Sequence, residues 1–469
     1  MHHGEIVFYY GDGLADVKKQ SKPNEDTVYP IASCSKAFTT ASCGLLVEEG
    51  KLSWNEPIRT YVPHFETKYD PEVGRRATLV DLCSHGTGLA PVDHSVCGFY
   101  DEFYNNVQDE VYIASKLPKA YDFRSRFLYN NTMLGVVGDI VAKVSGKTPG
   151  TFLRERIFEP LGMTRSCTTN AGLPSDDNIA MGYSVLDDGT LSEWDLPVLE
   201  DGRLQGGAGY VRSTAHDMMV WAKAVMEAES LQNSGMDHAG ALRRAPPEKN
   251  PLRQMQFIRT AHRPMIEERS PIENSYGLGW FRHMLPSSWL GSIGPNFGLF
   301  EDPPVINASG PPRLAIAHWG EFNGFLTSFY TFPETQSAII VMANCSPGRG
   351  DPTDLIAQEL AQDLFHMQPT VDFEKFAMQA AETSKLHWPA LVEEWVAKRV
   401  HNTKHRPLEE YVGSYRSSDF KLTIDVYQLD GDNAGNGPSP ELLGFIVNSM
   451  SKAVGEVAAL SLRCLDVPS

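Results

Sequence analysis

The strongest constraint on this chain is a serine and a lysine three residues apart, Ser33 and Lys36, at the start of an apolar stretch. Pro30 precedes the pair and Gly50 follows the stretch, which predicts a helix that ends just before this glycine. Residues three apart share a helix face, so the lysine amine can reach the serine hydroxyl. The helix N-terminus adds unpaired backbone N–H groups and a partial positive charge. This arrangement favours a serine that attacks a carbonyl carbon and stabilises the resulting oxyanion.

The same spacing recurs at Ser418–Lys421 and Ser449–Lys452, so spacing alone does not identify the nucleophile. A capping serine followed by a solvated lysine is the ordinary interpretation of such a pair. Cys34 lies beside Ser33 and is a second possible nucleophile. We interpret Cys34 as a buried structural thiol, because nothing in the sequence marks a lowered thiol pKa.

Composition excludes several classes of function. The 469 residues are 42% hydrophobic and 21% charged, as in soluble globular proteins with more than one domain. The net charge of −18 disfavours nucleic acid and membranes as partners. We see no signal-peptide organisation and no apolar run of the ~18 residues that cross a bilayer. The seven scattered cysteines show no metal-site spacing, so we expect a cytoplasmic protein without metal or cofactor.

A second polar motif, Tyr129-Asn130-Asn131, precedes a stretch with helical periodicity that ends at Gly146. We expect Asn131 or Thr132 to cap this helix, with Tyr129 projecting from the preceding loop. Tyr104 starts a similar Tyr-x-Asn sequence, so this motif is ambiguous when taken alone. His85 lies in a glycine-rich turn, and we interpret it as a structural histidine and not as a base.

Several segments predict the organisation of the chain. Strand-like runs and turn signals over residues 5–31 predict a hairpin that leads into the Ser33 helix. Residues 229–273 are polar and predict a surface insertion or lid. Residues 353–400 look helical, and strand-like sequence resumes after residue 407.

In combination, these motifs resemble the serine β-lactamase and penicillin-binding-protein superfamily, and most of all its class C-related esterase and D-aminopeptidase branch. The likeness covers about residues 5–345 in the expected order. The segments that carry it are Ser33-Cys34-Ser35-Lys36, Leu82 to Leu89 around His85, Tyr129-Asn130-Asn131, Pro160-Leu161-Gly162-Met163 and His318-Trp319-Gly320. The Pro160 segment selects Tyr129 over Tyr104 as the tyrosine of the second motif.

The resemblance implies an α/β (α+β) fold of the β-lactamase/transpeptidase type. We therefore expect an antiparallel sheet flanked by helices, a helical subdomain and a small C-terminal β-rich tail. We therefore expect three parts in the chain. These are a hydrolase domain over residues 1–370, with the 229–273 insertion, a helical linker over residues 371–406 and a β-rich domain over residues 407–469. The resemblance also implies that the leading helix and strand of the family are absent here and that the C-terminal domain is incomplete.

The resemblance also implies roles for the motif residues. Ser33 is expected to be the nucleophile, with Lys36 and Tyr129 as its general base. Asn131 is expected to orient Lys36 and the substrate, and the backbone N–H groups of Ser33 and Glu321 to form the oxyanion hole. Residues expected to bind substrate or the oxyanion are Asn131, His318, Trp319, Gly320 and Glu321.

The third motif departs from the family pattern in a way that bears on the substrate. His318 replaces the usual lysine, so the permanent cation that pairs with a substrate carboxylate is missing. Trp319 places a bulky apolar side chain where a small hydroxyl residue is common. Both changes favour an uncharged small ester or amide.

Three functions remain open from the sequence. The first is a serine hydrolase of small esters or amides, and the second is a transesterase that passes the same acyl group to an alcohol or amine in small-molecule biosynthesis. The third is a non-catalytic scaffold or binding protein with the same fold. The sequence does not specify the acyl group, the acceptor or the oligomeric state.

Overall fold

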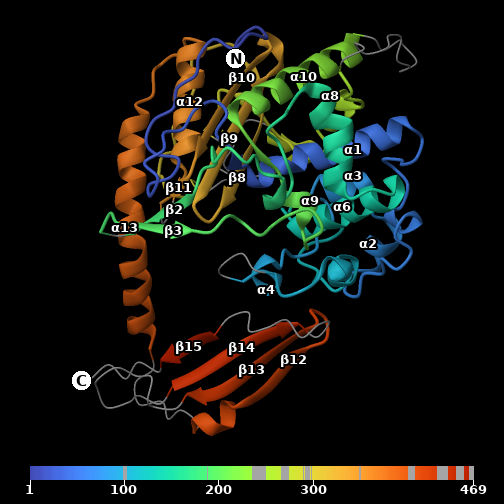
Figure 1. Cartoon of the computed structure of the whole chain (residues 1–469), viewed down its shortest axis with the longest axis vertical. Helices are drawn as coiled ribbons and strands as arrows, with labels where there is room; N and C mark the ends of the chain where they lie inside the picture. The colour runs from blue at the N-terminus through green and yellow to red at the C-terminus, as the bar shows by residue number, and fades with distance from the viewer. Residues whose placement is uncertain are drawn as a thin grey trace.

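A computed structural model describes residues 1–98, 103–186, 188–234, 250–265, 274–288, 298–347, 350–399, 407–429, 442–449 and 459–463, together with Leu290 and Asn296. Its centre is an antiparallel sheet (Figure 1). Within these residues the sheet has the strand order β10-β9-β8-β7-β6-β5. The strands are β5 (Arg263–Met265), β6 (Asn274–Tyr276), β7 (Phe281–Leu285), β8 (Arg313–Phe322), β9 (Phe325–Phe332) and β10 (Ser337–Ala343).

Side chains alternate across the sheet and build one apolar cluster on each face. On β8, Ile316 contributes to the larger cluster, whereas Ala315 and Ala317 contribute to the other. Helix α12 (Pro352–Leu364) packs its Leu355 and Ala361 against the second face. Helix α10 (Ala215–Ser234) packs against β10 from the larger cluster, which also receives α1. The sheet therefore lies between two helical layers (Figure 1).

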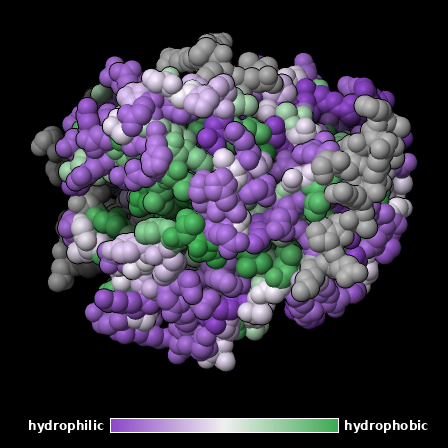
Figure 2. Space-filling model, turned by 90° about the horizontal axis from the view of Figure 1, so that it is seen from above, coloured by the Kyte–Doolittle hydropathy of each residue, from purple (hydrophilic) through white to green (hydrophobic). Residues whose placement is uncertain are grey.

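Helices and smaller sheets complete the main body. The remaining longer helices are α1 (Lys36–Glu48), α2 (Pro71–Arg76), α3 (Leu79–Cys83), α5 (Glu110–Ala114), α6 (Asn131–Ser145), α7 (Pro149–Leu153) and α11 (Met255–Arg259). Shorter helical turns include α4 (Asp93–Val96), α8 (Glu159–Leu161) and α9 (Gly206–Gly209). Small sheets pair β1 (Tyr29–Pro30) with β4 (Arg212–Ser213), and β2 (Gly182–Val185) with β3 (Leu191–Trp194) and β11 (Cys345–Ser346). Polar residues make up most of the surface seen from above, with apolar residues between them (Figure 2).

Two segments differ from the sequence-based expectations. Residues 5–27 contain no hairpin, because the run from Ile6 to Tyr10 is exposed and forms no strand. The segment makes only isolated bridges, and β1 is limited to Tyr29 and Pro30. Within the expected 229–273 insertion, the described residues 250–265 lie in the core, where Leu252, Met255 and Ile258 are buried and β5 extends the sheet. Residues 235–249 and 266–273 lie outside the described residues.

After α12, the helix α13 (Phe373–Lys398) runs along one side of the body toward a separate antiparallel sheet (Figure 1). That sheet consists of β12 (Gly413–Ser417), β13 (Leu422–Leu429), β14 (Leu442–Ser449) and β15 (Ala459–Arg463) in this order. The domain boundaries at 370 and 407 stay predictions. None of the helices described is long and apolar enough to span a membrane.

Candidate active site

Ser33 lies in a 3-10 turn, η1 (Ala32–Ser35), that continues directly into α1. The preceding residue, Ala32, has a φ of 44°, a left-handed conformation that is costly for a residue with a Cβ. The turn is held by the Ile31 N–H, which donates to the Val211 carbonyl at 3.0 Å. Strain next to a half-buried polar side chain is typical of catalytic turns, where the surrounding packing enforces it.

Lys36 is the first residue of α1 and is completely buried. Its Nζ lies 2.9 Å from Ser33 Oγ and 2.9 Å from the Ala208 carbonyl oxygen. Burial lowers the pKa of Lys36 to about 7, against the opposing effect of the Asp93 carboxylate. A neutral amine with one N–H on Ala208 keeps its lone pair free for the serine proton.

Tyr129 also contacts Ser33, and its hydroxyl donates to Ser33 Oγ at 2.9 Å. Burial raises the pKa of the Tyr129 phenol above its ordinary value, so the phenol keeps its proton in the free protein. The cap of α6 is Asn130, whose side chain accepts from the Met133 N–H and donates to the Leu89 carbonyl. This corrects the expectation that Asn131 or Thr132 caps the helix, and it fixes the residue next to Tyr129.

His85 contacts the loop that carries Tyr129 and Asn130. Its Nδ1 accepts a 3.1 Å hydrogen bond from the Asn130 backbone N–H, and its ring lies 4.4 Å from the Tyr129 ring. The backbone group can only donate, so the proton of the neutral ring is on Nε2. Burial lowers the pKa of His85 well below its ordinary value. The side chain therefore positions Tyr129 and Asn130, in agreement with its interpretation as a structural histidine.

Strand β8 brings the third motif to the site. His318 is buried, with Nδ1 donating to the Trp319 carbonyl at 2.6 Å and Nε2 accepting from the Tyr276 hydroxyl at 3.1 Å. Burial and the nearby Lys36 lower the pKa of His318 to about 3, so the ring is neutral. Trp319 stacks on Phe281 with ring centroids 4.3 Å apart and lies 6.3 Å from the Tyr129 ring. The roles expected for His318 and Trp319 stay predictions.

Asn131 and an aspartate that the sequence did not identify line the same site. Asn131 donates through Nδ2 to the Asp93 carboxylate at 3.1 Å, and Gln205 donates to the other oxygen of Asp93 at 2.8 Å. Asn131 Oδ1 is buried and has no hydrogen-bond partner among the described residues. Asp93 is the first residue of the short helix α4, and no sequence motif marks it. Its carboxylate is part of the electrostatic environment of Lys36.

The structure separates Ser33 from Cys34 and Ser418, whereas Lys452 of the pair Ser449–Lys452 lies outside the described residues. Burial raises the pKa of the Cys34 thiol, whose Sγ lies 3.6 Å from the His318 carbonyl oxygen. The amine of Lys421 contacts Asp109 rather than the hydroxyl of Ser418. Of these groups, only Ser33 is placed against both a lysine amine and a tyrosine hydroxyl.

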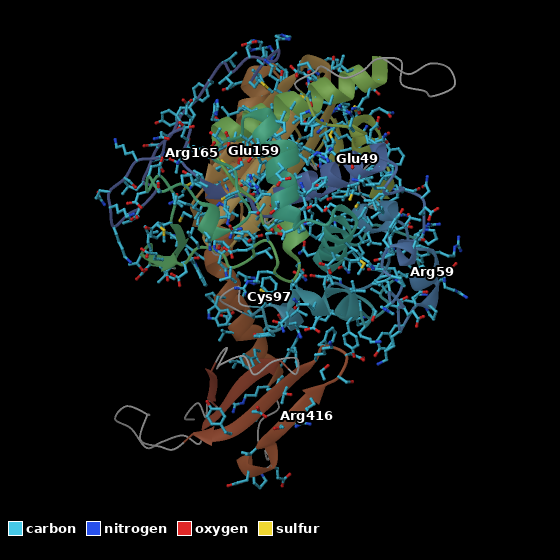
Figure 3. All side chains as sticks on the ribbon, turned by 45° about the vertical axis from the view of Figure 1, so that its right-hand side comes forward. Glu49, Arg59, Cys97, Glu159, Arg165 and Arg416 are labelled. Carbon is cyan, nitrogen blue, oxygen red and sulfur yellow. The ribbon has the colours of Figure 1, made fainter. Side chains whose placement is uncertain are left out.

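A pocket of about 510 Å³ opens at Ser33, a size that suits a small organic molecule. The charged side chains among its described lining residues are the carboxylates of Asp93 and Glu321. Its lining is Ala32, Ser33, Asp93, Cys97, Gly98, Phe103, Asn131, Leu199, Gln205, Ala208, Gly209, Glu321, Phe322 and Asn323. Cys97 marks the end of the main body that faces the C-terminal sheet (Figure 3).

Curated relatives match part of the chain. Unguisins hydrolase ungD of Aspergillus violaceofuscus is 28% identical over 234 residues, which cover 48% of this chain and 41% of the relative. The putative penicillin-binding protein PbpX of Bacillus subtilis is 27% identical over 228 residues, which cover 48% of this chain and 54% of the relative. The chain thus spans about half the length of these two relatives.

Solved structures share the fold at low sequence identity. The octameric penicillin-binding protein homologue from Pyrococcus abyssi superposes with a TM-score of 0.59 at 20% identity, over 98% of this chain and 83% of that chain. A class C β-lactamase from Rhodobacter sphaeroides gives 0.56 at 21% identity, over 76% and 90% of the two chains. The fold is therefore of the β-lactamase/transpeptidase type, as expected. A model of the Beta-lactamase family matches residues 1–363, and the chain belongs to this family.

Proposed function

We propose that this chain is a serine hydrolase that cleaves small uncharged esters or amides through an acyl-enzyme on Ser33. The observation that carries the proposal is the position of Ser33 Oγ, 2.9 Å from both Lys36 Nζ and the Tyr129 hydroxyl. A serine hydroxyl is a weak nucleophile until a neighbouring base takes its proton. Both neighbours lie within the distance that proton transfer requires.

Lys36 is the better candidate for the first base. With a pKa of about 7, roughly half of its amine is neutral at pH 7, whereas the Tyr129 phenol keeps its proton. In this mechanism Ser33 Oγ attacks the carbonyl carbon while its proton moves to Lys36 Nζ. The backbone N–H groups of Ser33 and Glu321 would stabilise the oxyanion.

Collapse of the tetrahedral intermediate then breaks the bond to the leaving group. The Lys36–Tyr129 pair returns a proton to the departing oxygen or nitrogen, leaving Ser33 acylated. Water attacks the acyl carbonyl in the second half of the reaction, with its proton passing to the same pair. The products are a carboxylic acid and the free serine.

The charges of the pocket support an uncharged substrate. His318 is neutral, and the charged lining residues described above are both acidic. A substrate carboxylate therefore loses a charge-assisted hydrogen bond worth about 1.5–3 kcal/mol, which corresponds to about ten- to a hundred-fold in affinity. Trp319 adds aromatic surface nearby, which suits aryl or alkyl groups. Penicillins and cephalosporins are expected to be poor substrates.

The proposal is tested by intact-mass analysis after incubation with p-nitrophenyl butyrate, followed by peptide mapping. We expect one butyryl adduct on Ser33, lost in Ser33→Ala and retained in Ser418→Ala. An adduct on Cys34, or efficient penicillin hydrolysis with negligible ester turnover, would overturn the proposal. Addition of an alcohol acceptor separates the alternatives, because a transesterase gives a new ester where a hydrolase gives butyrate.

A further inference from the structure

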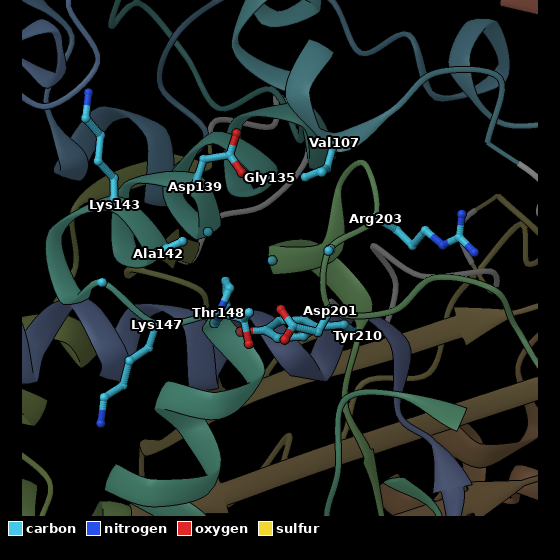
Figure 4. A pocket seen from close by; sticks show the side chains of 16 residues that line it. Val107, Gly135, Asp139, Ala142, Lys143, Lys147, Thr148, Asp201, Arg203 and Tyr210 are labelled. Atoms are coloured by element: carbon cyan, nitrogen blue, oxygen red, sulfur yellow. The ribbon is translucent and has the colours of Figure 1, made fainter. Parts of the chain in front are cut away.

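Exposed apolar side chains are concentrated on α13. The large hydrophobic residues of this helix that are 39–74% exposed are Met378, Leu386, Trp388, Leu391, Val392, Trp395 and Val396. By contrast, the pocket of about 600 Å³ beside α6 and α9 is bordered by Lys143, Lys147 and Arg203, whose charged ends extend away from its centre (Figure 4). Single exposed hydrophobic residues are ordinary on a protein surface, whereas a contiguous group of them marks an interaction site.

The C-terminal half of α13 has no contact that buries it. The first half packs against the main body through Phe373 and Ala380, which are buried, and Ser384 is half-buried. Every residue over 385–399 is exposed, and this part of the helix extends past the main body (Figure 1). At 1.5 Å per residue, the exposed stretch is about 20 Å long. A second helix can therefore approach it without meeting the main body of the same chain.

Four of the exposed residues form one apolar face. Trp388, Leu391, Val392 and Trp395 follow the spacing i, i+3, i+4 and i+7, which places them side by side along a helix. The two tryptophans are 63% and 74% exposed. A stripe of this kind normally packs against a core or a partner, because its contact with water is unfavourable.

The order of residues on this face is symmetric. A tryptophan stands at each end, and Leu391 and Val392 lie between them. In an antiparallel pair of such helices, a two-fold axis between residues 391 and 392 sets Trp388 against the partner's Trp395 at both ends. This axis lies near the middle of the exposed stretch, so the two main bodies lie at opposite ends of the pair. A parallel pair would bring the two bodies side by side.

The area of this face suits a small dimer interface. With about 200 Å² for each tryptophan, the face and the neighbouring Val396 expose on the order of 500 Å² in each copy. Pairing would remove about 1,000 Å² from water in total, which is the lower limit for a specific interface between proteins. We therefore expect an affinity in the micromolar range, since small interfaces retain little free energy after the cost of association.

We propose that two copies of this chain associate through α13 as an antiparallel, two-fold symmetric dimer. The contact between Trp388 and Trp395 occurs twice in such a dimer, and tryptophans commonly carry most of the binding energy of an interface. The like charges of Lys385 and the partner's Lys398 meet only at the exposed ends. There, Lys398 already pairs with Glu394 of its own chain.

The test is sedimentation velocity of the full chain over micromolar to submillimolar concentrations. We expect a reversible shift from monomer to dimer as the concentration rises. Trp395→Glu should weaken the association at least about thirtyfold, because both tryptophan contacts of the dimer are changed. Leu386→Glu is the matched control, since Leu386 is 68% exposed and lies on the other side of the same helix. Circular dichroism verifies that both variants keep their helix content.

A mixing experiment tests the antiparallel arrangement. Trp388→Lys and Trp395→Glu should each dissociate the dimer, and an equimolar mixture of the two variants should recover most of the association. In the mixed antiparallel pair, one end keeps its two tryptophans and the other brings the new lysine against the new glutamate.

The proposal is overturned by a chain that stays monomeric at submillimolar concentration, by equal weakening in Leu386→Glu, or by a mixture that does not recover. Association through the C-terminal sheet or another surface would leave the Trp395→Glu variant dimeric, which also overturns it. No substrate enters these measurements, so they do not depend on whether Ser33 is catalytic.

Discussion

Lys36 and Tyr129 contact the same serine oxygen, and burial shifts their pKa values in opposite directions. The charged form of each side chain loses its hydration, so the lysine gives up its proton more readily and the tyrosine less readily. At pH 7 about half of the free protein thus holds a neutral amine beside the neutral phenol around Ser33. This pairing divides the work between a base that accepts the first proton and an acid that can donate one.

The pH dependence of turnover follows from the pKa of Lys36. Below about pH 7 the amine is protonated and cannot accept the serine proton, so activity should fall as the pH is lowered. We expect kcat/KM for a neutral p-nitrophenyl ester to rise about tenfold per pH unit below pH 7 and to level off above it. Stopped-flow measurements from pH 5 to 9 check this, and a flat profile between pH 6 and 8 would contradict it.

Lys36 and Tyr129 should behave as one unit. Lys36→Ala and Tyr129→Phe are each expected to lower kcat by about 10²–10⁴-fold, the usual contribution of a general acid or base. The double variant should be little worse than the weaker single variant, because each group needs the other. Additive losses would mean separate roles. Tyr104→Phe is the matched control and should keep most of the turnover.

The motif residues at the site could be predicted because each belongs to an ordered set of short sequences. The positions of Ser33, Lys36 and Tyr129 agree with that prediction in placing them together. Asp93 could not be predicted, since it begins the short helix α4 outside every motif and reaches the site only through the folded chain. The hydrogen bond from Asn130 to His85 also depends on a long-range approach that local sequence does not specify.

At the scale of elements, the site depends on how closely β8 approaches the turn before α1. A Cβ built on Gly320 would lie 2.1 Å from the Ile31 carbonyl oxygen, which belongs to the backbone and cannot move aside easily. Glycine here lets the strand that carries the third motif lie against the turn that carries Ser33. The sequence marked Gly320 as part of a motif, but only the packing of two distant elements explains why a side chain is excluded.

Gly320→Ala should therefore destabilise the fold by about 1–3 kcal/mol, as overpacking does, and reduce turnover. Gly138→Ala is the matched control, because its Cβ would meet Gly207 at an ordinary 3.5 Å and it lies inside α6. That variant should be neutral or stabilising by about 0.5–1 kcal/mol. Urea unfolding of both proteins measures the difference, and equal stabilities would refute the proposed steric role.

At the scale of the whole molecule, the C-terminal sheet contacts the main body through the turn between β12 and β13. Lys421 pairs with Asp109, and the carbonyl oxygens of Ser418 and Phe420 accept from Tyr112 and Asn105. Asp419 accepts from Lys68 and Tyr69 nearby. These polar contacts are partly exposed, and Phe420 of the same turn packs against the larger apolar cluster, so a single turn joins the sheet to the main body. Sequence indicated strands after residue 407, whereas this docking depends on side chains over 300 positions apart.

Loss of the Lys421 contact should loosen this sheet without changing the main body. Lys421→Ala removes a pair worth about 1 kcal/mol, which corresponds to about fivefold faster local opening. Hydrogen exchange over residues 413–429 should accelerate accordingly, while exchange in α1 stays the same. Lys398→Ala, which breaks an exposed pair with Glu394, is the control. Unchanged exchange in both variants would show that the other contacts suffice.

Helix α9, whose Ala208 and Gly209 line the Ser33 pocket, restricts how the substrate preference of this protein can be engineered. Side chains cannot be added to it freely, because a Cβ on Gly207 would lie 2.4 Å from the Leu134 carbonyl oxygen and one on Gly209 would lie 2.7 Å from Leu199. Its carbonyl groups are also occupied, since Ala208 accepts from Lys36 and Gly207 from Thr39. Saturation libraries directed at this segment should yield mostly inactive clones. Libraries directed at Phe103, Leu199 and Phe322, which line the Ser33 pocket from other segments, should yield the altered selectivities.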